Sequence, residues 1–302
     1  MNTILTSTSG GLEAAAIEPF FYSLRASGCK ADVVVFAANI SAECQALLKQ
    51  YQATVVDFDY RGMPSLHSLA QRLRAGSRAA YRYYRRPRAD AKEHAYLFFN
   101  NARFFCYRDY LLNMREKPGL VFLSDLRDVV FQTDPFSWPF QPGISVAVEC
   151  TSRKIKDSWA AVKGLLESTS VRETFRLGRH DIVCAGTTMA DYGTMMKYLE
   201  LMTAGINRRF FWGLLDGIDQ GLHTYFTHNR LISPTHYYTN WTGPFLTMDS
   251  EVVLPKHKNA EGYLCNEDGS IVPIVHQYDR VKGLYQPGEK VPPCWKYYPV
   301  TR

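Results

Sequence analysis

The feature that most constrains the fold is a series of apolar runs that alternate with helical segments near the start of the chain. The runs lie at Thr3–Thr8, Ala31–Ala38 and Ala53–Phe58, and helical patterns occupy Leu12–Ala26 and Ser41–Tyr51 between them. Strands and helices that alternate at this spacing form right-handed crossovers and place the strands in parallel. The sequence therefore predicts an α/β fold with a mainly parallel central sheet and flanking helices.

The composition is that of a folded, aromatic-rich protein in a reducing compartment. The 302 residues are 46% hydrophobic and 14% aromatic, which is enough to bury a large core. The seven cysteines are scattered singly without CxxC spacing, which favours reduced thiols and argues against a structural zinc site. The start lacks the pattern of a signal peptide, and no run approaches the roughly 18 apolar residues of a membrane span. We therefore expect a cytoplasmic protein.

An apolar run in the middle of the chain is followed at once by acidic side chains. Leu120–Leu123 has the continuous hydrophobicity of a strand buried on both faces, and Asp125, Arg127 and Asp128 come directly after it. Open α/β sheets bind ligands at the carboxyl ends of their strands. Two carboxylates on one turn can hold a hard divalent cation through oxygen. The alternative is a surface turn with an internal Asp–Arg pair.

Two other predicted strands carry residues that suit a ligand-binding site. The strand that contains IVCAGTTM has a small-residue break at Ala185-Gly186, where a ligand or another backbone can approach closely. The last predicted strand ends at His276. Together with Asp125 and Asp128, this histidine would form a mixed oxygen and nitrogen site suited to manganese or magnesium. A histidine after a strand can also be purely structural.

Cationic side chains near these positions suit a phosphorylated ligand. Arg103 lies in a helix predicted over Glu93–Asn113, where it either snorkels at the surface or supplies a planar cation to a phosphate. Arg280 and Lys282 closely follow His276, and positive charge beside a metal-binding histidine suits a diphosphate.

An Asp-Gln pair begins another helix. Asp219 and Gln220 stand near the start of the helix predicted at Asp216–Phe226. A carboxylate at this position can serve only the electrostatics of the helix N-terminus. It can also take part in a catalytic site.

A basic and aromatic stretch, Arg72–Arg88, stands out because no acid occurs between Asp59 and Asp90. Such a face can lie on an anionic lipid surface or hold an anionic acceptor, and the tail Val291–Arg302 could be a second surface anchor. The alternative is a solvated helix face. Nucleic acid is a poor explanation, because no recognition module is present and the net charge is only +6, from 35 basic minus 29 acidic residues.

The order of these motifs resembles that of the GT-A-fold glycosyltransferases, and most of all the retaining glycosyltransferase family eight, the group of glycogenin and the bacterial lipooligosaccharide galactosyltransferases. The matching residues are Arg103 in ARFFCYRDYL, Asp125 in FLSDLRD, Ala185-Gly186 in CAGTTMA, Asp219-Gln220 in IDQGL and His276 in IVHQYDR. The pattern departs from the family at Arg127, where the family has its second aspartate, and after His276, where the family's Gly and Lys-Pro-Trp signature is missing. The resemblance therefore implies a relative in a different family with the same fold.

The resemblance implies a domain plan. We expect a GT-A-type, Rossmann-like sheet in a single catalytic domain over residues 1–280. Its nucleotide-binding half would be residues 1–136 and its acceptor and sugar half residues 137–280. Residues 281–302 would form a basic aromatic tail.

The resemblance also implies a reaction. We expect a metal-dependent glycosyltransferase that moves a sugar from a nucleotide-sugar, most simply a UDP-sugar, to a glycan or lipid-linked glycan of the cell surface. Transfer would proceed with retention, at the inner face of the membrane. The expected roles are Mn²⁺ or Mg²⁺ ligation by Asp125, Asp128 and His276, donor binding by Thr6, Ser7, Thr8, Arg103, Arg127, Ala185, Gly186, Arg280 and Lys282, and catalysis by Asp219 and Gln220.

Several alternatives remain open at the level of sequence. Asp219 could form a covalent glycosyl intermediate. An inverting enzyme would instead need a general base, for which Asp191 or Asp249 is available. A nucleotidyltransferase is disfavoured, because Ser9-Gly10-Gly11 lacks a nearby Arg or Lys. A non-catalytic glycan- or membrane-binding domain of the same fold is the remaining reading.

Overall fold

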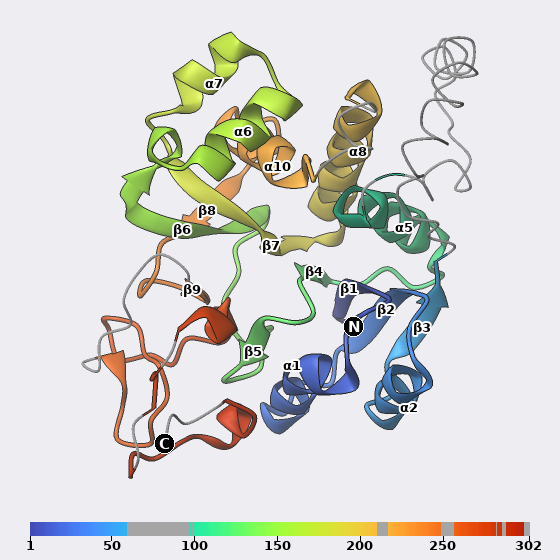
Figure 1. The fold of residues 1–302 in the computed structure, drawn as a ribbon, viewed down its shortest axis with the longest axis vertical. Helices are drawn as coiled ribbons and strands as arrows, with labels where there is room; N and C mark the ends of the chain where they lie inside the picture. Colours follow the sequence, from blue (N-terminus) through green and yellow to red (C-terminus); the bar gives the residue numbers. More distant parts are fainter. Residues whose placement is uncertain are drawn as a thin grey trace.

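The structure is a computed structural model that describes residues 1–58, 97, 99–209, 217–248, 257–281, 283–285 and 288–298. Figure 1 shows its arrangement. The predicted basic stretch Arg72–Arg88 lies outside the described residues, and so do Asp249 and Lys282. None of the helices in the described ranges combines the length and the apolar character that crossing a bilayer requires.

The N-terminal part alternates strands and helices as predicted. Its elements are β1 (Thr3–Ser9), α1 (Ala14–Ala26), β2 (Asp32–Ala38), α2 (Ala42–Gln50) and β3 (Thr54–Asp57). Strands β1 and β2 pair in parallel, as do β2 and β3. Ser41 is the N-cap of α2, because its hydroxyl accepts a hydrogen bond of 3.2 Å from the backbone N–H of Cys44. The predicted parallel sheet is therefore confirmed here.

Within the described ranges, the central sheet has seven strands in the order β3-β2-β1-β4-β7-β6-β8. The four later strands are β4 (Leu120–Ser124), β6 (Ile144–Lys154), β7 (Asp181–Asp191) and β8 (Thr235–Tyr238). Strand β4 continues the parallel half, whereas β7 runs antiparallel to both β4 and β6. The sheet is thus mainly parallel, with one reversed strand beside β4.

Helices cover both faces of this sheet (Figure 1). The remaining helices are α5 (Phe99–Asn113), η1 (Ile155–Asp157), α6 (Trp159–Ser168), α7 (Val171–Leu177), α8 (Tyr192–Arg208), α10 (Asp219–His228), η3 (Tyr278–Arg280) and η4 (Pro293–Trp295). Alternate residues of a strand face opposite sides. Accordingly, Val121 and Leu123 lie in the core beneath α5 and α8, whereas Phe122 packs with α1 on the other face.

A second, three-stranded sheet joins distant parts of the chain. Its order is β5-β10-β9, with β5 at Val129–Phe131, β10 at Ile274–His276 and β9 at Phe245–Thr247. Strands β5 and β10 are antiparallel, and their register places His276 opposite Val129. The last predicted strand therefore ends beside the acidic turn that follows β4.

The C-terminal segment packs into the protein. Trp295 and Tyr298 are buried in a third core together with Tyr285. The indole N–H of Trp295 donates a hydrogen bond of 3.0 Å to Oε1 of Gln132. The expectation of a free aromatic arm or surface anchor is therefore wrong for Trp295 and Tyr298, whose large rings stabilise the fold by leaving water. All seven cysteines are free thiols, as predicted.

Candidate active site

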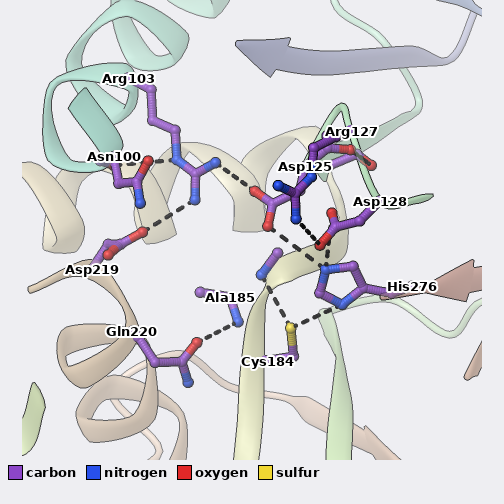
Figure 2. Close-up of polar contacts among 12 residues, drawn as sticks. Asn100, Arg103, Asp125, Arg127, Asp128, Cys184, Ala185, Asp219, Gln220 and His276 are labelled. Atoms are coloured by element: carbon purple, nitrogen blue, oxygen red, sulfur yellow. Dashed lines mark hydrogen bonds and ion pairs between the residues drawn. The ribbon is translucent and has the colours of Figure 1, made fainter. Parts of the chain in front are cut away.

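Three side chains with metal-binding groups meet where the two sheets join (Figure 2). Asp125 directly follows β4, and its backbone N–H donates a hydrogen bond of 2.8 Å to the carbonyl of Gly186 in β7. Asp128 precedes β5, and its carbonyl accepts 2.7 Å from the N–H of Gln277, the residue after β10. His276 ends β10. Backbone hydrogen bonds at the end of β4 and at the end of β10 thus fix the three residues predicted to form the site, which lie close together.

The geometry of this group suits a divalent cation. One ligand atom from each of Asp125, Asp128 and His276 lies within 4.8 Å of the others. Nε2 of His276 is 3.7 Å from Oδ2 of Asp125 and 3.6 Å from Oδ1 of Asp128, too far for hydrogen bonds. This buried nitrogen has no hydrogen-bond partner among the described residues. A cation between the carboxylates and the imidazole would satisfy it, and the ligand set fits Mn²⁺ or Mg²⁺.

Gly186 leaves the space that this group occupies. A Cβ atom at Gly186 would lie 2.5 Å from Oδ2 of Asp125 and 3.0 Å from Nε2 of His276. Any larger residue would therefore push into both ligands. The predicted small-residue break in this strand is confirmed as a site of close approach.

Arg103 links the metal-binding group to α10. Its Nη1 donates 2.6 Å to Oδ1 of Asp125, its Nη2 donates 3.1 Å to Oδ2 of Asp219, and its Nε donates 3.2 Å to the carbonyl of Asn100. The fork of a guanidinium is suited to two carboxylates at once. Arg103 was expected to contact phosphate, and in the structure its donors engage carboxylates.

The charges in this cluster change one another's protonation. Burial alone would raise the pKa of Asp125, but the Arg103 guanidinium and the His276 imidazole hold that pKa well below its usual range. Burial raises the pKa of Asp219, and Arg103 offsets this effect only in part. Asp125 is consequently ready to bind a cation as a carboxylate at neutral pH.

The Asp-Gln pair lies on the first turn of α10, near β7. Asp219 is its first residue, and the preceding N–H of Ile218 donates 3.1 Å to Oδ1 of buried Asn101 in α5. The carboxamide of Gln220 accepts 3.0 Å from the N–H of Ala185 and donates to the carbonyl of Val183. Gln220 therefore anchors α10 to the strand segment next to Gly186.

The other predicted donor-binding residues occupy different surroundings. Arg127 is half exposed, and its Nη2 lies 3.2 Å from Oδ2 of Asp279 and 4.0 Å from Oδ2 of Asp128. Its guanidinium thus lies beside carboxylates of the protein itself. Arg280 is exposed in η3. Lys282 lies outside the described residues.

Strand β1 carries the hydroxyl residues expected to meet the nucleotide. Thr6, Ser7 and Thr8 are buried, and the hydroxyls of Thr6 and Thr8 have no hydrogen-bond partner in the described ranges. Leu5 pairs with Leu123, so Ser7 is level with the turn at Asp125. These residues therefore lie at the same strand edge as the acidic turn.

Cys184 is a neighbour of the site that sequence reasoning missed. Its Sγ lies 3.4 Å from Nδ1 of His276 and accepts 3.3 Å from the N–H of Gly186. Burial would lower the pKa of His276, but Cys184 and the two carboxylates raise it well above its ordinary value. A single cysteine before Ala185-Gly186 carries no sequence signal of this contact, because the contact depends on how β10 of the second sheet lies beside β7 of the central sheet.

The arrangement of strands and helices defines the class of fold: the chain has the GT-A fold, as the sequence predicted. A crystal structure of an active-site mutant of LgtC is similar to it, with a TM-score of 0.50 and 9% identity over 91% of this chain and 87% of that one. A structure of the galactosyltransferase LgtC in complex with donor and acceptor sugar analogues has a TM-score of 0.48 and 10% identity, with the same coverage. No model of a protein family matches the sequence, and no curated protein matches it significantly.

Proposed function

We propose that this protein is a metal-dependent glycosyltransferase that transfers a sugar from a nucleotide-sugar, most simply a UDP-sugar, to a surface-glycan acceptor with retention. The observation that carries the proposal is the group of Asp125, Asp128 and His276 at the carboxyl end of β4, in which the buried Nε2 of His276 finds no partner in the described part of the chain. The GT-A fold supports it, because this edge of an α/β sheet is where ligands bind.

The metal-binding group and its neighbours would act on the diphosphate of the donor. A bound Mn²⁺ or Mg²⁺ would neutralise the charge that develops on this leaving group. Asp125, Asp128 and His276 would hold the ion, and Arg103 keeps Asp125 in place and ionised. Arg280 and Lys282 remain proposed contacts of the phosphates. Thr6, Ser7 and Thr8 are proposed to receive the base and ribose.

Asp219 and Gln220 would act on the sugar side. Asp219 is buried and held by Arg103, and its proposed role is to accept hydrogen bonds from sugar hydroxyls. Gln220 fixes the backbone at Ala185 against α10 by accepting a hydrogen bond from its N–H. Inversion with Asp191 as base is disfavoured, because its carboxylate caps α8 through Thr194 and accepts 3.0 Å from the N–H of Gly143.

The test is calorimetric titration of the protein with UDP in the presence and absence of Mn²⁺. Wild type is expected to bind UDP more tightly with the ion. Asp125→Ala and His276→Ala are each expected to abolish this Mn²⁺ dependence, because each removes a ligand, while the circular dichroism spectrum stays native. Slow hydrolysis of a panel of UDP-, GDP- and CMP-sugars, with the released anomer identified by NMR, tests the donor class and retention.

His236→Ala is the matched control, because it removes an exposed imidazole far from the three ligands in sequence, which pairs with the carbonyl of Pro142. It should leave the Mn²⁺ dependence intact. Unchanged binding in Asp125→Ala and His276→Ala would show that the metal assignment is incorrect. Metal-dependent UDP binding without hydrolysis of any sugar in the panel would favour a non-catalytic binding domain.

A further inference from the structure

Helices α6 and α7 expose large apolar side chains to solvent. Phe175 is 79% exposed, Trp159 75%, Val171 61% and Leu166 38%. Among the described residues, nine large hydrophobic side chains are exposed, and four of them fall in this one segment. Apolar side chains scattered singly over a surface need no explanation, whereas a cluster marks an interaction site.

The exposed residues occupy one face of each helix. Trp159 and Leu166 share a face of α6 with Lys163, since helical residues four and seven apart lie above one another. Val171 and Phe175 share a face of α7 for the same reason. The opposite faces are buried through Leu165 of α6 and Leu177 of α7. Both helices therefore carry apolar side chains on an exposed face as well as on the inner face that is packed into the protein.

The two helices are neighbours, and they lie at one end of the molecule. Only Thr169 and Ser170 separate them in the chain, and they contact each other. Figure 1 shows α7 at the periphery, on the side of the protein far from α1 and α2. We call the exposed residues Trp159, Leu166, Val171 and Phe175 of these two contacting helices the α6–α7 surface.

The charge around this surface is positive. Residues 153–180 contain seven Lys and Arg and three Asp and Glu, a net charge of +4. Arg153, Lys156, Arg172 and Arg179 are exposed. A second copy of the chain would bring the same positive charge and be repelled, whereas an anionic surface is attracted.

We propose that the α6–α7 surface docks the protein on an anionic lipid bilayer. Trp and Phe side chains sit favourably at the boundary between headgroups and acyl chains, and Lys and Arg beside them bind anionic headgroups. This surface differs from the basic stretch Arg72–Arg88 and from the C-terminal segment, whose aromatic residues are buried.

The surface is coupled to the site through direct packing. Gly164 of α6 approaches Gly221 of α10 so closely that a Cβ on Gly221 would lie 2.1 Å from the carbonyl oxygen of Gly164. Gly221 follows Gln220. If the proposed function holds, on which this step rests, docking through α6 and α7 holds α10 near the lipid surface, where a lipid-linked acceptor would present its glycan.

The experiment is co-sedimentation of the full chain with vesicles of phosphatidylcholine alone or with 30% phosphatidylglycerol, a composition chosen at about the anionic content that polybasic surfaces recognise. Wild type should bind the anionic vesicles, and binding should weaken as salt rises. Trp159→Ser/Phe175→Ser should reduce the partition coefficient at least tenfold. Arg172→Gln/Arg179→Gln should reduce binding to the anionic vesicles alone. Leu112→Ser, which removes a 55% exposed residue on α5, is the matched control and should bind as wild type.

Three results would overturn the proposal: no binding of wild type to anionic vesicles, equal binding of Trp159→Ser/Phe175→Ser and wild type, or a dimer that this variant splits without loss of vesicle binding. The last would assign the surface to a second copy. Asp125→Asn separates this proposal from the proposed function. It should bind vesicles normally, and Trp159→Ser/Phe175→Ser should keep Mn²⁺-dependent UDP binding.

Discussion

At the scale of single residues, the absence of a side chain at Gly186 is as important as the ligands around it. Gly186→Ala places a methyl group 2.5 Å from Asp125 Oδ2 and 2.9 Å from His276 Cε1. Both side chains must move, so we expect metal affinity to fall by about 10- to 100-fold, the range for changes that misorient ligands. Titration with Mn²⁺ measures this directly.

Gly193→Ala is the control for this change. A Cβ at Gly193 would meet only Oδ1 of Asp191, at an ordinary 3.5 Å. It should bind Mn²⁺ as wild type does. Equal affinities for the two variants would mean that Gly186 does not set the geometry of the site.

Buried His223 predicts a second residue-scale effect, on stability against pH. Its Nδ1 pairs with the hydroxyl of Tyr198 at 2.8 Å, and burial lowers its pKa to about 3. In the unfolded chain the imidazole of His223 is therefore protonated as the pH falls below about 6.5. In the folded protein it stays neutral until the pH approaches 3. The stabilisation from neutral His223 is complete above 6.5 and is lost as pH falls through this window, by about 1.4 kcal/mol per pH unit.

His223→Gln removes this proton uptake and keeps an acceptor for Tyr198. The free energy of unfolding in urea, measured at several pH values between 6.5 and 4, should fall less steeply than in wild type by about 1.4 kcal/mol per pH unit. His236→Gln serves as the control imidazole. The same slope in His223→Gln and wild type would show that His223 titrates normally in the folded protein.

At the scale of elements, the contact between α6 and α10 fixes the position of the Asp-Gln pair. Gly221→Ala would place Cβ 2.1 Å from the carbonyl oxygen of Gly164 and 2.3 Å from Oγ of Ser168. Because the first obstacle is backbone, α10 must shift. We expect a loss of about 1–3 kcal/mol in the free energy of unfolding, together with weaker UDP-sugar binding.

The facing glycine provides a matched control. At Gly164 a Cβ would meet the backbone N of Gly221 at 3.6 Å, an ordinary contact. Gly164→Ala should be neutral, or stabilising by up to about 1 kcal/mol through helix propensity. Chemical unfolding and donor titration of both variants compare the two helices. Equal effects of the two substitutions would contradict the close approach.

The elements themselves were largely predictable, because their signals are local. Ser41 caps α2 and Ser158 caps α6, each by accepting a hydrogen bond from the backbone N–H three residues on, and α2 starts as expected. The apolar run before Asp125 forms β4. Pairing is different: that β7 reverses beside β4, or that β10 lies against β5, depends on contacts between residues far apart in sequence. No local pattern encodes such registers.

The candidate site follows the same division. Asp125, Asp128 and His276 were predictable from carboxylates and an imidazole at strand ends, and the structure brings them together. The pairing of Arg103 with both Asp125 and Asp219 was not predictable, because α5, β4 and α10 approach only in the folded protein. The contact of Cys184 with His276 was missed for the same reason.

At the scale of the whole molecule, the C-terminal segment packs against the second sheet. Trp295 is 1% exposed and packs against Tyr285 and Tyr298, while its N–H bonds Gln132. Trp295→Ala should lower the free energy of unfolding by about 3–5 kcal/mol, since it leaves a cavity and removes one of the two hydrogen bonds that Oε1 of Gln132 accepts. Urea unfolding measures this loss.

Lys296→Ala is the neighbouring control. Its ammonium lies over the rings of Tyr22 and Tyr297 near the surface, and we expect a change below about 1 kcal/mol. If Trp295→Ala were equally mild, the segment would contribute little to the fold.

The meeting of two sheets at the metal-binding group has a consequence for the order in which the protein is made. Asp125 belongs to the first sheet, whereas His276 arrives with β10, near the end of synthesis. The N-terminal strands can pair while the ribosome is still adding residues, but no growing chain can assemble all three ligands before β10 lies against β5. An incomplete copy of this protein is therefore unable to bring the residues of its candidate cation site together, however well its first half has folded.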